Sequence, residues 1–228
     1  MQQLPSQQVA TDSSSSEFDG WTTHVFGATL LPSFSLPWFY AGRAQRLAEG
    51  GHVHYHAMPK GGLGRTEDIV EKFVPLLETA ERSGEKVRLM GHSLGGVVAW
   101  ALAHEFCDAV DTVEVWGAPL RGTGLANFFK FIKPVKEATD LARGSEFLAG
   151  YDRPLNGPTV RSIYTAVDLF VIPPRETCYA EGDRAENHFL SPRPLAGAEL
   201  RPAEQVHTGV ADHVLLPRHG GLLSAMAA

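Results

Sequence analysis

Short β-rich runs alternate along this chain with segments of helical spacing, and this alternation restricts the fold more than any other feature. Glycine or proline residues bound the runs, as is typical where a strand ends in a turn. The runs cover residues 23–31, 52–58, 87–90, 111–117 and 159–167. The helical segments cover residues 43–50, 66–80 and 97–106. Strands that alternate with helices are joined by right-handed crossovers, so we predict an α/β fold with a mostly parallel central sheet flanked by helices.

Residues 66–80 have the clearest helical pattern. Their apolar face consists of Ile69, Phe73, Leu76, Leu77 and Ala80. Thr66 is predicted to cap the N-terminus of this helix, because a threonine hydroxyl can accept from the free amides there. Pro75 predicts a kink within it.

The length of 228 residues is enough for one sizeable core and short for two. Residues 1–20 are rich in Gln and Ser and carry too little apolar surface to offset the entropy of ordering them. We therefore predict a disordered N-terminal tail over residues 1–20 and a single domain over residues 21–228.

Charge and hydropathy argue against two classes of partner. The formal net charge is -6 and the basic residues are scattered, so we expect no nucleic-acid partner. No apolar run approaches the roughly 18 residues that span a bilayer, and we expect no transmembrane segment. The N-terminus lacks the positive and apolar regions of a signal peptide, which favours a cytoplasmic location, with secretion as the alternative. We expect Cys107 and Cys178 to be structural thiols, because two cysteines make no disulfide framework.

A glycine-framed serine lies in the stretch VRLMGHSLGGVVAW, residues 87–100. Gly91 and Gly95 stand two residues on either side of Ser93, between a short β-run and an apolar helical run. In this G-x-S-x-G pattern a strand turns abruptly into a helix and exposes the serine hydroxyl above the carboxyl edge of the sheet. The helix N-terminus favours negative charge, and the amide of Leu94 is available to an oxyanion. The pattern therefore predicts a nucleophile, with a plain turn as the alternative.

The motif GHSLGG resembles the nucleophile elbow of the α/β-hydrolase superfamily, in particular its compact bacterial-type lipases and esterases. The resemblance runs from about residue 21 to the end and includes VWGAPLRGTG at residues 115–124, IYTAVDLFVIPP at 163–174 and HTGVADHVLLP at 207–217. It implies the α/β-hydrolase fold with a small cap or lid, a carboxylic ester hydrolase that works through an acyl-enzyme, and no cofactor.

A serine nucleophile needs a base, and the base needs an acid that orients it. In this fold the chain order is serine, acid, histidine, so both partners follow Ser93. His213 matches the family's catalytic histidine in GV-x-H lipases and is the favoured base, with His219 as the alternative. We expect His188 and His207 to be exposed.

Asp168 is the favoured acid, because it follows the predicted strand at 159–167, at the edge where this architecture places catalytic groups. It also matches the family's D-x-x-V-x-P signature, together with Val171 and Pro173. The weaker candidates are Glu176, Asp183 and Asp212.

The second oxyanion amide usually follows the first core strand, where many relatives have His-Gly. This chain has Phe26 and Gly27 there, so Ala28 is the expected donor and Thr29 the alternative. The missing histidine leaves that local geometry open.

Residues 122–158 lie where lipases place a lid. Residues 124–142 are unusually aromatic, with Phe128, Phe131 and Ile132 in an apolar stripe at helical spacing. Such a stripe is more often core packing than a lipid surface. If it covers the site, these residues and Thr29 would bind substrate.

Two further patterns could suggest other ligands. His52, His54 and His56 alternate along one strand face, as metal ligands could, but no cysteine or acidic cluster accompanies them. We therefore interpret them as a polar strand face and expect no metal. KGGLGR at residues 60–65 lacks the Gly-Lys-Ser/Thr order of a phosphate loop and predicts a flexible connector.

These features together predict a serine hydrolase that cleaves an apolar or lipid-like carboxylic ester through Ser93, Asp168 and His213. The same acyl-enzyme could pass to an alcohol, an amine or a thioester partner, so an acyltransferase, thioesterase or lactonising enzyme is the alternative. A non-catalytic binding protein is a further alternative, because a fold does not determine a function.

Overall fold

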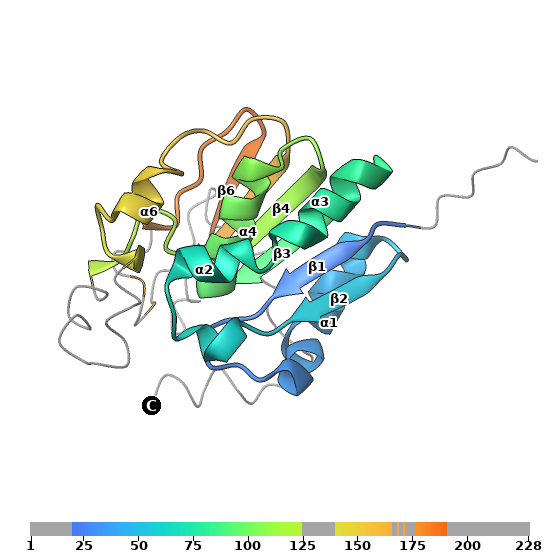
Figure 1. The fold of residues 1–228 in the computed structure, drawn as a ribbon, viewed down its shortest axis with the longest axis horizontal. Coiled ribbons are helices and arrows are strands. Elements are labelled where there is room, and N and C mark those ends of the chain that lie inside the picture. Colours follow the sequence, from blue (N-terminus) through green and yellow to red (C-terminus); the bar gives the residue numbers. More distant parts are fainter. Residues whose placement is uncertain (1–19, 125–139, 166–167, 169–170, 172–176, 191–228) are drawn as a thin grey trace, which may run out of the picture.

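The computed structural model describes residues 20–124, 140–165, 168, 171 and 177–190 of the chain. Six strands form one sheet in the order β2-β1-β3-β4-β5-β6, and all neighbouring strands are parallel (Figure 1). Their bounds are β1 Thr23–Phe26, β2 Val53–His56, β3 Val87–His92, β4 Val110–Trp116, β5 Thr159–Thr165 and β6 Ala185–Leu190. The predicted α/β class with a parallel sheet is therefore confirmed.

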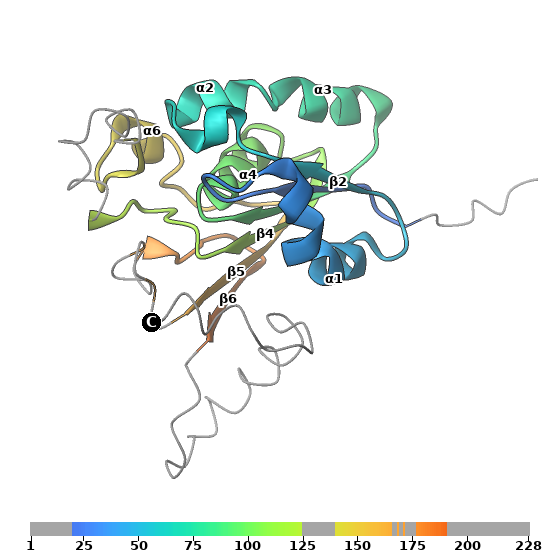
Figure 2. The same ribbon diagram turned by 90° about the horizontal axis from the view of Figure 1, so that it is seen from below.

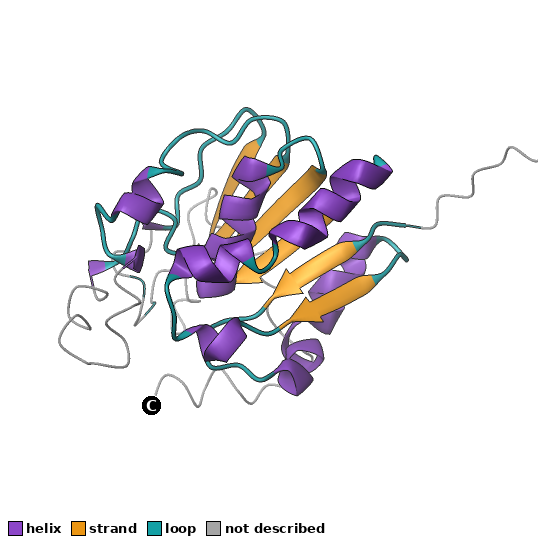
Figure 3. Ribbon diagram, in the orientation of Figure 1, coloured by secondary structure: helices purple, strands orange, loops and turns teal. Residues whose placement is uncertain are grey.

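Helices cover both faces of the sheet (Figures 2 and 3). Helix α1, Leu36–Ala48, lies on one face after the 3-10 turn η1, Ser33–Ser35. Helices α2, Thr66–Glu71, α3, Val74–Ser83, and α4, Leu94–Glu105, lie on the other. The 3-10 turn η2, Pro59–Gly62, follows β2, and the short helix α6, Glu146–Ala149, lies beyond β4.

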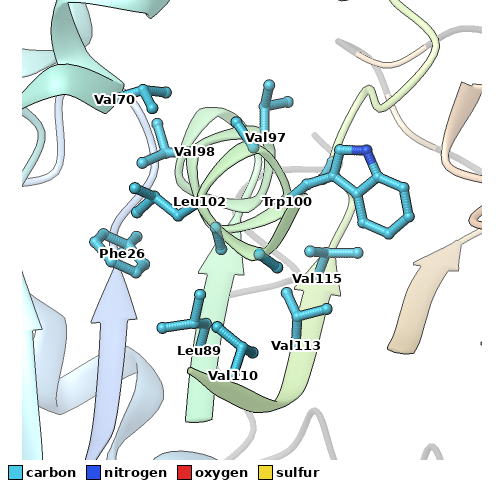
Figure 4. Close-up of a cluster of buried hydrophobic side chains, with 14 of the residues drawn as sticks. Phe26, Val70, Leu89, Val97, Val98, Trp100, Leu102, Val110, Val113 and Val115 are labelled. Carbon is cyan, nitrogen blue, oxygen red and sulfur yellow. The ribbon is translucent and has the colours of Figure 1, made fainter. Parts of the chain in front are cut away.

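The larger core lies between the sheet and α4. Every residue of α4 except Glu105 is buried, so this helix is apolar on all sides. Figure 4 shows Val98 and Leu102 of α4 pointing toward Phe26 and Val70. The other face of the sheet packs under α1, where Val25, Met90 and Trp116 meet Tyr40 and other buried residues of the helix. Both faces of the central strands are therefore covered, and most residues of β3 and β4 are buried whichever face they point to.

Several predicted elements differ in detail. Strand β6 was not predicted, because its sequence AENHFL mixes polar and apolar residues at the edge of the sheet. Helix α1 begins at Leu36, seven residues before the predicted start at Arg43, with a proline in its first turn where the missing amide costs nothing. The predicted helix over 66–80 is two helices, with the break before Pro75.

The predicted capping role of Thr66 is wrong. Arg65 occupies the N-cap position, and the backbone amide of Thr66 donates to Asp140 Oδ2 at 2.8 Å. A carboxylate remote in sequence therefore satisfies this helix end, which no local pattern could indicate. Asp140 also begins the part of the 122–158 segment that the structure describes after residue 124.

Residues 140–158 pack against the main core. Leu148 and Leu155 belong to its buried cluster, and Tyr151 Oη donates to Glu105 Oε1 at 2.5 Å. Thr123 and Ala142 pair as a parallel β-bridge, which brings the ends of the intervening segment side by side. The aromatic residues Phe128, Phe131 and Ile132 lie outside the described residues, and so does the N-terminal tail up to residue 19.

Three further sequence expectations bear on the described part of the chain. Cys107 and Cys178 are both free thiols, as expected. No helix in this part is long and apolar enough to cross a membrane. Within the same part, no group of three or more His, Cys, Asp or Glu residues has an arrangement that could hold a metal.

Histidines from two neighbouring strands meet on the face of the sheet that α2 and α3 cover. His24 Nδ1 lies 3.0 Å from His56 Nε2, and His54 stacks on His24 with ring centroids 5.2 Å apart. Burial and the neighbouring histidines lower the pKa of His24 to about 3 and that of His56 to about 4. Both rings are therefore neutral near pH 7, and one nitrogen donates to the other.

We predict that this pair makes the fold sensitive to acid. The pKa of both groups is lower in the folded state than the ordinary value of 6.5, so below pH 6.5 the unfolded chain takes up protons that the folded chain does not. The free energy of unfolding should therefore fall as the pH drops from 6.5 toward 4, by at most about 1.4 kcal/mol per pH unit for His24. Urea titrations at several pH values would measure this slope.

A double variant, His24→Val with His56→Phe, should have a shallower slope over the same range, whereas His52→Asn should leave it unchanged, because His52 is exposed. An equal slope in the double variant and the wild type would contradict this explanation.

Candidate active site

Ser93 occupies a sharp turn between β3 and α4. Its φ of 54° and ψ of -121° lie outside the backbone regions that residues other than glycine ordinarily adopt. Such a conformation costs about 1–3 kcal/mol and persists only where the surroundings hold it. Here the amide of Ser93 donates to the Trp116 carbonyl at 2.9 Å, and its carbonyl accepts from the amides of Gly96 and Val97 at 3.0 and 3.2 Å. The serine is therefore held in a strained position at the carboxyl edge of the sheet.

The glycines that frame the serine allow close backbone contacts. A Cβ at Gly91 would lie 2.2 Å from the Gly95 carbonyl oxygen, and a Cβ at Gly95 would lie 2.3 Å from the Phe26 carbonyl oxygen. A Cβ at Gly96 would lie 2.5 Å from Ala118 Cβ. Side chains at these positions would separate α4 from β1 and from the chain after β4. The turn at Ser93 therefore requires residues without a side chain at positions 91 and 95.

Leu94 is the first residue of α4, so its amide has no carbonyl partner within the helix. The loop after β1 approaches it from one side. The side chains of Leu94 and Thr29 both border Gly62, where an added Cβ would lie 2.7 Å from Leu94 Cδ2 and 3.3 Å from Thr29 Oγ1. The loop that holds both expected second donors, Ala28 and Thr29, thus lies beside the turn at Ser93.

The loop after β1 has a defined conformation. The amide of Leu31 donates to the Ala28 carbonyl at 3.3 Å, and the amide of Leu30 donates to the Gly61 carbonyl at 2.8 Å. Leu30 itself has a φ of 63°, which is unusual for a residue with a branched side chain. Burial raises the pKa of the Tyr40 hydroxyl, and the nearby backbone of Ala28 opposes that shift.

Asp168 lies at the same edge of the sheet, three residues beyond the end of β5. Its Oδ1 accepts from the amide of Val171 at 2.9 Å. Its Oδ2 would lie 3.3 Å from a Cβ at Gly117, so the carboxylate lies over the end of β4. Strand β4 is the neighbour of β3, the strand that leads into the elbow, so the carboxylate lies one strand away from the elbow in the sheet. Its charge also acts on two buried groups, His92 and Cys178.

His92 is the last residue of β3 and directly precedes the serine. Its Nδ1 lies 2.8 Å from the Tyr40 hydroxyl of α1. Burial lowers the pKa of His92, and the carboxylate of Asp168 opposes that shift without overcoming it. The ring is therefore neutral near pH 7. Neither His92 nor Tyr40 was among the site residues predicted from the sequence.

The remaining sequence candidates divide into two groups. Asp183 precedes β6 and accepts from the amide of Gly157, which precedes β5, so it lies at the amino edge of the sheet, away from Ser93. His188 lies within β6, is half-buried and contacts Glu186 Oε2 at 3.3 Å, so it is not at the carboxyl edge. The other candidates lie outside the described residues: His207, His213, His219, Glu176, Asp212, Phe128, Phe131 and Ile132.

We predict that alanine at position 95 destabilises the fold, whereas alanine at position 42 does not. Gly95→Ala places a methyl group against the Phe26 carbonyl and should lower the free energy of unfolding by at least about 2 kcal/mol. Gly42 lies in α1, where an added Cβ meets nothing within 4 Å, so Gly42→Ala should raise it by roughly 0.5–1 kcal/mol. Urea unfolding of both variants would measure the two changes, and equal effects would contradict the close contact at Gly95.

Comparison with known proteins identifies the fold. No protein-family model matches this sequence, and no curated protein matches it. Among solved structures, lipase B of Aspergillus fumigatus superposes with a TM-score of 0.59 at 16% identity, over 75% of this chain and 44% of the lipase. This chain thus spans less than half the length of that lipase.

With two other solved structures, the superposition covers a larger share of the other chain. The monoacylglycerol lipase of Paleococcus ferrophilus superposes with a TM-score of 0.53 at 15% identity, over 84% of this chain and 92% of the lipase. A structure of the metagenome-derived lipolytic enzymes LipS and LipT superposes with a TM-score of 0.58 at 15% identity, over 75% and 84% of the two chains. The parallel sheet, the strained serine between β3 and α4 and these neighbours agree, and the protein has the α/β-hydrolase fold.

Proposed function

We propose that this protein is a serine hydrolase that cleaves carboxylic esters. The observation that carries the proposal is the strained backbone of Ser93, at a turn where Gly91 and Gly95 allow close backbone contacts. A strained backbone conformation at the carboxyl edge of a sheet costs conformational free energy, and such conformations cluster at functional sites. The neighbouring lipases have the same fold, and hydrolysis of an ester is the chemistry that this arrangement suits best.

In the proposed reaction, the Ser93 hydroxyl attacks the ester carbonyl and passes its proton to His213. Asp168 orients the imidazole and stabilises its charged form. The imidazolium then donates its proton to the leaving alcohol as the acyl-enzyme forms. Water, activated by the same histidine, releases the acid and restores the serine. No step requires a metal or a cofactor.

The oxyanion of the tetrahedral intermediate needs two amide donors in this scheme. Leu94 supplies one from the first turn of α4, where the helix dipole also favours negative charge. Ala28 is the expected second donor and Thr29 the alternative, and both lie in the loop after β1. Both donors belong to segments that the structure brings together at Gly62.

His213 is proposed as the base because of the course of the chain. Strand β6 runs parallel to β3 and β5 and ends at Leu190, so the chain after it begins at the edge that carries Ser93 and Asp168. His213 and His219 both follow this point, and the resemblance of GVADH to lipase motifs favours His213.

The substrate is proposed to have an apolar acyl chain. Residues 140–158 belong to the packed domain, so the candidate lid reduces to the aromatic segment with Phe128, Phe131 and Ile132. Thr29 borders the elbow and would contact the acyl group from the other side.

We predict that Ser93→Ala lowers ester hydrolysis by roughly a thousandfold or more, because it removes the nucleophile. A fluorophosphonate should label wild-type Ser93, as peptide mass spectrometry would show, and should not label the variant. His213→Ala should lose hydrolysis to a similar degree, and His219→Ala should retain it.

Circular dichroism would confirm that each variant is folded. Equal activity of His213→Ala and the wild type would exclude His213 as the base, and loss in His219→Ala alone would assign the base to His219. Absence of both label and turnover in folded wild type would favour a non-catalytic binding protein.

A second prediction concerns the acyl chain. Replacing Phe128 and Phe131 together with serine should raise KM for long-chain p-nitrophenyl esters far more than KM for the acetate, because only the long chain would contact the aromatic segment. Equal changes for both esters would contradict a role in acyl binding. Product analysis with added alcohol or amine would measure how much of the acyl group passes to acceptors other than water.

A further inference from the structure

Large hydrophobic side chains are exposed together at one place on this protein. The apolar patch, as we call it, consists of Leu30, which is 67% exposed, Phe34 at 85%, Trp38 at 68% and Phe39 at 42%. Leu30 lies in the loop after β1, Phe34 in η1 and the other two in the first turn of α1. Among the described residues, Tyr179 is the only other large hydrophobic residue that is exposed. Exposed apolar side chains that gather in this way mark a binding surface, because burying them is favourable.

The apolar patch adjoins the candidate active site. The side chain of Leu30 borders Gly61, where an added Cβ would lie 3.2 Å from Leu30 Cδ2. The next residue, Gly62, borders the side chain of Leu94, which directly follows Ser93. The patch therefore lies beside the elbow, at the carboxyl edge of the sheet.

Leu30 is held in its exposed position by a strained backbone. Its φ of 63° lies in the left-handed region, which a residue with a branched side chain seldom adopts. The bond from its amide to the Gly61 carbonyl, at 2.8 Å, fixes this conformation against η2. Strained residues cluster at functional sites. An exposed leucine gains little burial within the chain to offset the strain, which indicates contact with another surface.

The backbone of the segment that carries the patch has few amides that need water. The amide and the hydroxyl of Ser35 both donate to the Pro32 carbonyl, at 3.0 and 2.8 Å. The amide of Leu36 donates to the Ser33 carbonyl, and neither Pro32 nor Pro37 has an amide. Unsatisfied backbone groups are costly in an apolar phase. The segment can therefore approach such a phase at a small cost.

The charges around the patch also suit a lipid surface. Residues 20–48 include no Asp or Glu, whereas the whole chain has 26. A carboxylate would oppose contact with an apolar phase. The cations of this segment are Arg43 and Arg46, and Arg43 is paired with the buried Glu114. Since the net charge of the chain is -6, we expect no long-range attraction to anionic lipids.

We infer that the apolar patch docks on the surface of a zwitterionic phospholipid bilayer. Leu30, Phe34 and Trp38 are each exposed by two thirds or more, so they project from the protein. A protein partner would need a complementary shape, whereas a fluid lipid surface accepts projecting side chains, and aromatic rings bind at its interface. Docking would bring the elbow to the lipid surface. This deepens the proposed function, on which the conclusion about the substrate rests, whereas docking itself needs no hydrolysis.

The test measures how the full chain partitions onto phosphatidylcholine vesicles, by flotation. Wild type is compared with the double variant Phe34→Ser with Trp38→Ser, and with Tyr179→Ser as the control, because Tyr179 is exposed outside the patch. We expect the partition coefficient to fall by at least about 30-fold in the double variant and to stay within about twofold of wild type in the control. Circular dichroism would confirm that each variant is folded. An equal coefficient in the double variant and wild type would overturn the inference.

Tryptophan fluorescence measures whether the patch itself enters the lipid. The difference in emission between wild type and Trp38→Phe isolates Trp38, because Trp100 and Trp116 are buried in both proteins. With vesicles, this signal should shift to shorter wavelength and be quenched by lipids that carry bromine on the acyl chain. Vesicle binding without this quenching would overturn the inference.

Two other occupants of the patch give different results. Sedimentation would detect a second copy of this chain as a dimer that the double variant abolishes. Iodide would fail to quench the Trp38 signal without vesicles if another part of the same chain covered the patch. Either result, or absence of vesicle binding by wild type, would overturn the inference.

Activity separates the docking surface from the proposed reaction. Hydrolysis of a long-chain ester carried in the vesicles, per site titrated with fluorophosphonate, should fall in the double variant by the same factor as the partition coefficient at low lipid concentration. Vesicle binding without fluorophosphonate labelling or hydrolysis would overturn the proposed function and leave the docking surface in place. Labelling and hydrolysis of dissolved esters without vesicle binding would overturn the docking surface alone.

Discussion

The first turn of α4 lies in direct backbone contact with β1 and β3, and the rest of the site depends on that contact. Gly95 lies against the carbonyls of Phe26 and Gly27, and Gly91 lies against the carbonyl of Gly95. With a side chain at either position the helix would have to move away from the sheet. Ser93 would then lose its strained backbone, and the Leu94 amide would leave the loop after β1. Van der Waals exclusion at two glycines thus decides where the hydroxyl and the amides lie.

The burial of α4 supplies the energy that keeps the strained turn in place. Nearly the whole helix is apolar and buried between the sheet, α2 and α3, as Figure 4 shows for Val98 and Leu102. Burying a single valine or leucine side chain stabilises the fold by about 1.5–3 kcal/mol, which is comparable to the cost of the conformation at Ser93. The core therefore compensates locally for the strain, and the serine can be held in a conformation that an exposed loop would not retain.

Polar groups inside the molecule have different consequences on the two faces of the sheet. Under α1, Glu114 and Arg43 form a charged pair that sets the position of the helix and of Tyr40. Under α2 and α3, His24 and His56 remain neutral and hydrogen-bonded, and their lowered pKa values make the fold less stable in acid. The first arrangement determines geometry near the site, whereas the second determines the pH range of the fold.

The sequence by itself determined the class of fold, five of the six strands and the elbow at Ser93, because these depend on local periodicity and on the absence of side chains at particular glycines. The position of Asp168 at the carboxyl edge of the sheet was also predictable, since it follows a recognisable strand. Edge strand β6 escaped prediction because its polar residues are tolerated where one side of a strand is unpaired, and the capping of Thr66 by Asp140 depends on residues remote in sequence. The hydrogen bond between Tyr40 and His92 was decided only by the tertiary structure. Such contacts follow from how α1 packs on the sheet, and no spacing along the chain encodes that packing.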